Sequence, residues 1–145
     1  MSTRPSPLAG LLAGAAALLA ALPAAAQPAP MRGPPLPSAD CFLMRDWEGW
    51  STPAPDTLYL QVRGGDVYRV DLYGRTSMLK SPGRFLISRD HGTGRVCSPV
   101  DLQLDVADLS GFTQPLFPLT IAKLSPAEVS ALPREHRPIH ARRAG

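Results

Sequence analysis

The sequence has few residues of the kinds that build redox or metal sites. Its 145 residues contain two cysteines, Cys41 and Cys97, and three histidines. The cysteines lie 56 positions apart, whereas redox dithiols usually lie close together, as in C-x-x-C. Pro138 separates His136 from His140 and prevents a regular helix from placing both imidazoles on one face. We therefore predict no metal site, no cofactor and no catalytic dithiol.

Motifs for nucleophilic catalysis are also missing, because no G-x-S-x-G or similar frame occurs. His91 is the only histidine of the predicted domain, and its Gly-rich surroundings are typical of a turn. Asp101 and Asp105 alternate with apolar residues, which predicts one solvated strand face. We predict no catalytic residue, and the alternative is a small hydrolase-like enzyme that uses aspartates and His91.

The longest apolar run, residues 8–22, is too short to cross a membrane, since a spanning helix needs about 20 residues. Arg4 precedes this run, and residues 23–26 read Pro-Ala-Ala-Ala, which suits signal peptidase. We predict that residues 1–26 are a cleaved signal peptide. The mature protein is then periplasmic or secreted, with no membrane-spanning segment, and the alternative is an uncleaved anchor.

Charge is not concentrated in the predicted domain. The formal net charge is +3, and the arginines before the C-terminal end are scattered singly. This pattern does not fit nucleic-acid binding, which requires a basic face. Residues 27–40 are Pro-rich and predict a linker, residues 41–132 a single domain, and residues 133–145 a basic flexible tail. Association of this tail with anionic envelope components is a further alternative.

Alternating apolar residues predict a β-hairpin over residues 57–72. A three-residue turn, Gly64-Gly65-Asp66, would set Leu60 beside Val70 and keep the apolar side chains on one face. Further strands are expected at residues 84–88, 95–97, 102–106 and around 119–121.

One short helix is expected to follow the last strand. Ser125, Pro126 and Glu128 form a capping box with proline at the first helical position. The helix is expected to dock on the sheet through Val129 and Leu132. The fold class is therefore mostly β, a small antiparallel sheet or partly closed barrel with one short C-terminal helix.

Two cysteines in an exported chain favour a structural Cys41–Cys97 disulfide, with free thiols or redox use as the alternatives. Five short motifs occur in order, beginning at residues 41, 56, 66, 95 and 121. In these motifs the chain resembles an uncharacterised family of small exported bacterial proteins, known only as a domain of unknown function (DUF). The resemblance implies export and a β-rich domain, and it implies no activity. Members of that family carry two further cysteines, which are absent near Thr76 and near Leu116 or Phe117.

Four residues form a candidate binding surface: Arg45, Trp47, Trp50 and Arg63. Tryptophans in a small β domain usually belong to the core, but an exposed ring near an arginine could bind a sugar, a peptide or a protein. We predict an exported binding or accessory protein that engages an envelope protein or a glycan. The sequence carries no indication of its oligomeric state.

Overall fold

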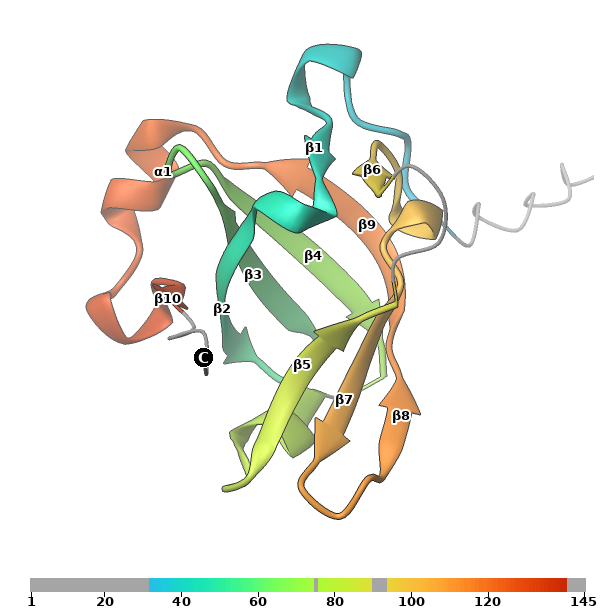
Figure 1. Cartoon of the computed structure of the whole chain (residues 1–145). Coiled ribbons are helices and arrows are strands. Elements are labelled where there is room, and N and C mark those ends of the chain that lie inside the picture. Colours follow the sequence, from blue (N-terminus) through green and yellow to red (C-terminus); the bar gives the residue numbers. More distant parts are fainter. Residues whose placement is uncertain (1–31, 75, 90–93, 141–145) are drawn as a thin grey trace, which may run out of the picture.

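The computed structural model describes residues 32–74, 76–89 and 94–140. In these residues the predicted fold class is confirmed: the chain is mostly β, with three small antiparallel sheets, one α-helix and no closed barrel (Figure 1). The strands are β1 (Phe42–Leu43), β2 (Trp47–Ala54), β3 (Thr57–Val62), β4 (Val67–Tyr73), β5 (Arg84–Ser88), β6 (Arg95–Val96), β7 (Leu104–Asp108), β8 (Thr113–Pro115), β9 (Phe117–Lys123) and β10 (Ile139–His140), and the helix is α1 (Pro126–Ala131). Short 3-10 helices occur at Ser38–Asp40, Met44–Asp46, Thr76–Lys80, Pro99–Asp101 and Arg134–His136.

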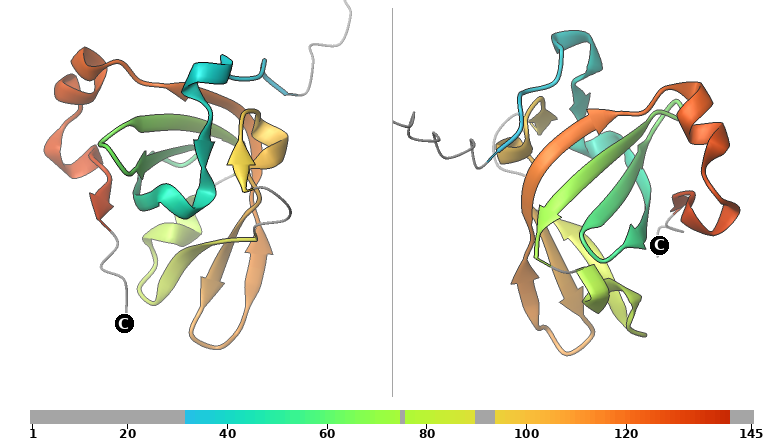
Figure 2. Two further views of the ribbon diagram at one scale, coloured as in Figure 1. Left: turned by 45° about the horizontal axis from the view of Figure 1, so that its top comes forward. Right: turned by 180° about the vertical axis from the view of Figure 1, so that it is seen from behind.

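The largest sheet is curved and has the order β10-β2-β3-β4-β9, beside a three-stranded β5-β7-β8 sheet and a β1-β6 pair (Figure 2). The chain passes from β8 to β9 through Leu116, whose N–H donates to Leu104 O at 2.8 Å and so connects the two larger sheets. One apolar core contains residues from all three sheets. Its fully enclosed members include Leu58, Leu60, Val70 and Val106, each with an exposed fraction of 0%.

The hairpin of β3 and β4 has the predicted faces but a different register. Leu60 lies opposite Tyr68 and Leu58 opposite Val70, so the predicted pairing of Leu60 with Val70 is wrong by two residues. The loop has three residues, but they are Arg63, Gly64 and Gly65. Gly64 and Gly65 adopt φ of 95° and 90°, which non-glycine residues rarely adopt, and these two positions fix the turn one residue earlier.

The strand β2 was not predicted, because its apolar residues do not alternate. The register of β2 against β3 shifts between Trp47 and Gly49, so that Trp47 pairs with Val62 and Trp50 with Leu60. A β-bulge of this kind adds one residue to a strand and so interrupts the alternation of its side chains between the two faces of the sheet. It places two tryptophans that are three positions apart on the same core-facing side.

The described parts of the predicted linker and of the predicted tail form hydrogen bonds with the domain. In the predicted linker, the N–H of Gly33 donates to Leu119 O, the N–H of Leu36 donates to Cys97 O, and Leu36 packs on the core. In the predicted tail, β10 pairs with β2 and the hydroxyl of Ser51 donates to His136 O. Backbone groups of the described part of the predicted tail thus bond to the sheet, and residues 141–145 lie outside the described part.

The helix α1 begins as the capping box predicted. The N–H of Glu128 donates to Ser125 Oγ at 3.3 Å, and the Glu128 carboxylate accepts from the N–H and hydroxyl of Ser125 at 2.7 Å. The same hydrogen bonds lower the pKa of Glu128 below its usual value. The predicted docking face is incomplete, since Val129 and Leu132 are only partly buried and the helix has no buried residue.

Candidate functional site

The predicted disulfide is present between Cys41 and Cys97, with a Cα–Cα distance of 4.6 Å. It connects the residue before β1 to the residue after β6, and both cysteines are partly buried. No helix among the described residues is long and apolar enough to span a membrane. The disulfide is compatible with an exported protein, and the predicted signal peptide, residues 1–26, lies outside the described residues.

The candidate surface of Arg45, Trp47, Trp50 and Arg63 is only partly assembled. Both tryptophans pack against the core, and Trp47 Nε1 donates to Gly49 O at 2.9 Å. Arg63 lies 3.6 Å from an Asp46 oxygen. This surface stays a prediction, in which the tryptophan rings serve first to pack the core.

The aspartates considered for catalysis have structural surroundings. Asp101 does not share a strand face with Asp105, because it ends a 3-10 helix, where its carboxylate accepts from the N–H groups of Cys97 and Ser98. The prediction of a solvated face at Asp105 is wrong, since this residue is 4% exposed and pairs with Arg89 at 2.8 Å. His91 lies outside the described residues. The described residues contain no group of three or more His, Cys, Asp or Glu that could hold a metal.

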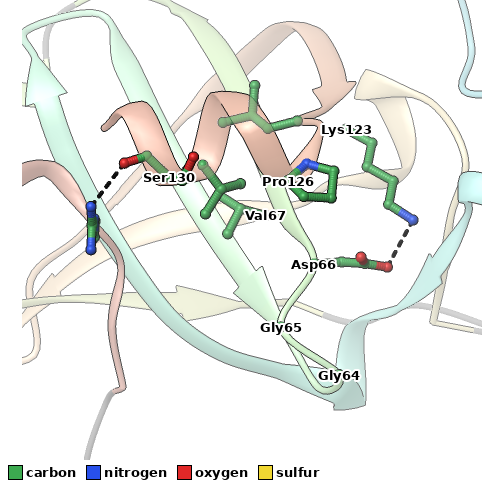
Figure 3. A pocket seen from close by; sticks show the side chains of 10 residues that line it. Gly64, Gly65, Asp66, Val67, Lys123, Pro126 and Ser130 are labelled. Atoms are coloured by element: carbon green, nitrogen blue, oxygen red, sulfur yellow. Dashed lines mark hydrogen bonds and ion pairs between the residues drawn. The ribbon is translucent and has the colours of Figure 1, made fainter. Parts of the chain in front are cut away.

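A cleft of about 460 Å³ lies between α1 and the turn of the β3–β4 hairpin (Figure 3). Its apolar lining consists of Val67, Leu124, Pro126 and Val129. It has the size of a small-ligand site, and it is open to solvent. The helix α1 leaves the cleft open, since it has no buried residue and Val129 is only partly buried.

A cluster of ion pairs lies at one end of the cleft. Lys123 Nζ lies 2.8 Å from an Asp66 oxygen and 3.5 Å from an Asp40 oxygen. The hydrogen bond with Asp66 raises the pKa of Lys123 above its usual value. Asp40 also connects to the core, because its carbonyl accepts from the hydroxyl of Tyr68 at 2.8 Å, and burial raises the pKa of that phenol. This end is polar, and its one ammonium and two carboxylates leave it with a net negative charge.

Arg137 lines the other end of the cleft. Its Nε donates to Leu132 O at 3.1 Å and its Nη2 donates to Ser130 O at 2.9 Å. Ser130 lies in the last turn of α1, and Leu132 is the residue after the helix. Carbonyls at these positions lack hydrogen-bond donors within the helix. Among the described residues, no carboxylate forms an ion pair with Arg137. Its guanidinium is therefore held in place while its charge is not neutralised.

Comparison with known proteins gives no match. No family model matches the chain, and neither a curated protein nor a solved structure does. The resemblance to an exported family therefore stays a prediction.

Sequence reasoning missed the cleft and its arginine. Arg137 was assigned to a flexible tail because its neighbours are polar and basic. A local signal was present, since basic residues just after a helix often bind its last carbonyls. The positions of Gly64, Gly65 and Asp66 across the cleft depend on the tertiary fold, and no sequence pattern places them beside α1.

Proposed function

We propose that this protein is an exported, non-enzymatic binding or accessory domain that engages an envelope protein or glycan through the cleft beside α1. The observation that carries the proposal is the cleft itself, which combines an apolar floor with charged groups at both ends. Small-ligand and peptide sites commonly combine a mainly apolar lining with a few fixed polar groups.

The scaffold supports this role. The disulfide joins the β1–β6 pair, the hairpin strands β3 and β4 pair with β2 and β9, and the capping box and Arg137 bind the two ends of α1. A site held on such elements loses little conformational entropy when it binds. The aspartates that an enzyme would need have structural partners, which favours binding over catalysis.

Substitution of the cleft floor is expected to abolish capture of the partner. Val129→Asp places a carboxylate in the apolar lining, whereas Val100→Asp makes the same change at an exposed position outside the cleft. The oxidised mature protein and both variants are immobilised and exposed to envelope extracts of the natural producing cell. We expect the wild type and Val100→Asp to retain one stoichiometric component that Val129→Asp loses by at least about tenfold.

Two results would overturn the proposal. The first is retention of the same component by Val129→Asp, which would place the binding surface elsewhere. The second is the absence of any stoichiometric component on the wild-type protein. Circular dichroism and urea unfolding of Val129→Asp verify that a loss of capture is not a loss of folding.

A further inference from the structure

We propose that the ligand of the cleft beside α1 is a peptide or protein carboxyl terminus that ends in an apolar residue. This inference rests on the proposed function and specifies its ligand. The terminal carboxylate binds the guanidinium of Arg137, the last side chain covers the floor around Val67 and Val129, and the preceding backbone reaches the Asp66–Lys123 end.

The first argument is the state of Arg137. Two of its nitrogens are bound to the carbonyls of Ser130 and Leu132, which fixes the plane of the guanidinium at the cleft. Its charge has no carboxylate partner within the described residues. A guanidinium pairs with a carboxylate through charge-assisted hydrogen bonds, which are stronger than neutral ones. Arg137 is exposed, so a carboxylate that enters the cleft can pair with the donors that the two carbonyls leave.

The second argument is the short extent of the apolar lining. Figure 3 shows Ser130, whose carbonyl accepts from Arg137, on the side away from the Asp66–Lys123 pair, with Val67 and Pro126 between them. A long acyl chain with a carboxylate would cover the polar pair without hydrogen bonding to it, which costs free energy. A peptide end supplies a carboxylate, one apolar side chain, and backbone N–H and C=O groups in that order.

The third argument concerns the chain's own C-terminal end. Residues 141–145 include Arg142 and Arg143. Their positive charges would lie near Arg137 if the carboxyl end of this segment bound that guanidinium, and like charges repel. Charge complementarity therefore favours a ligand from another molecule.

The inference is tested with two peptides of one sequence, acetyl-Gly-Ala-Ala-Leu, as the free acid and as the C-terminal amide. Isothermal titration calorimetry with the oxidised mature protein measures both dissociation constants. We expect the acid to bind about tenfold more tightly than the amide, because only the acid pairs with Arg137. Decanoate is titrated as the acyl-chain probe, and we expect it to bind more weakly than the acid peptide.

Variants identify the arginine that is responsible. Arg137→Gln is expected to remove the preference for the acid, so that acid and amide bind equally. Arg137→Lys keeps the charge without the guanidinium fork, and it should retain part of the preference. Arg134→Gln is the matched control, because Arg134 is exposed in the same segment and does not line the cleft. The acid-to-amide ratio is the readout, since a general loosening of α1 lowers both affinities together.

The outcomes separate this inference from the proposed function. Equal binding of acid and amide by the wild type, an unchanged ratio in Arg137→Gln, or binding of neither peptide would overturn the carboxyl-terminus ligand. Tighter binding of decanoate would overturn it in favour of a lipid. An increase of more than about tenfold in peptide affinity on deletion of residues 141–145 would assign the cleft to the chain's own end. In each case the capture experiment with Val129→Asp still decides whether the cleft binds an envelope component.

Discussion

Removal of the disulfide by the double substitution Cys41→Ser and Cys97→Ser is expected to lower the free energy of unfolding by about 4 kcal/mol. The disulfide closes a loop across a sequence separation of 56, and loop closure restricts the unfolded chain. The strands that it joins, β1 and β6, pair over only two residues each. Folded domains are stable by about 5–15 kcal/mol in total, so this loss is a large part of the whole.

Urea unfolding measures the effect. The oxidised wild type should unfold at a distinctly higher urea concentration than the double variant. The reduced wild type should unfold at the same urea concentration as the double variant. The reductant should leave the double variant unchanged, which controls for effects of the reductant itself. Coincident unfolding of oxidised and reduced wild type would contradict a stabilising role of the disulfide.

Truncation of Leu60 to alanine is expected to cost about 3 kcal/mol of unfolding free energy. Leu60 has an exposed fraction of 0% and belongs to the core, opposite Tyr68 on β4 and Trp50 on β2. The smaller side chain leaves a cavity that the surrounding strands cannot fully close. Leu109→Ala is the matched control, because Leu109 is 88% exposed and the same change there should cost less than about 0.5 kcal/mol.

Urea unfolding of the two leucine variants provides the measurement. The midpoint of Leu60→Ala should fall while the slope stays unchanged. Equal midpoints for Leu60→Ala and Leu109→Ala would show that β3 does not face a packed core.

Local patterns predicted the parts of the fold that depend on neighbouring residues. The alternation in residues 58–62 fixed which face of β3 is apolar, but alternation leaves shifts of two residues undetermined. The register was therefore settled by Gly64 and Gly65, whose positive φ values place the turn. The capping box at Ser125 was sufficient to locate the start of α1.

Features that depend on contacts between distant segments were not predictable in this way. The bulge in β2 concealed a strand, because it removes the alternation that marks one. Tyr59 alternates with the apolar residues of β3, yet it is buried at 9% exposure opposite Ser51, whose hydroxyl donates to His136 O. The cleft likewise combines three separated segments, and the order of their residues in the chain does not indicate that they meet.

We propose that the mature protein is an exported β scaffold held by one disulfide, and the intact mass of the protein from its producing cell is the measurement that decides this. The protein is isolated from its producing cell and alkylated before and after reduction. The account predicts the mass of residues 27–145, with no alkylation before reduction and two alkylated cysteines after it. A mass that includes residues 1–26, together with two cysteines that react before reduction, would contradict the account.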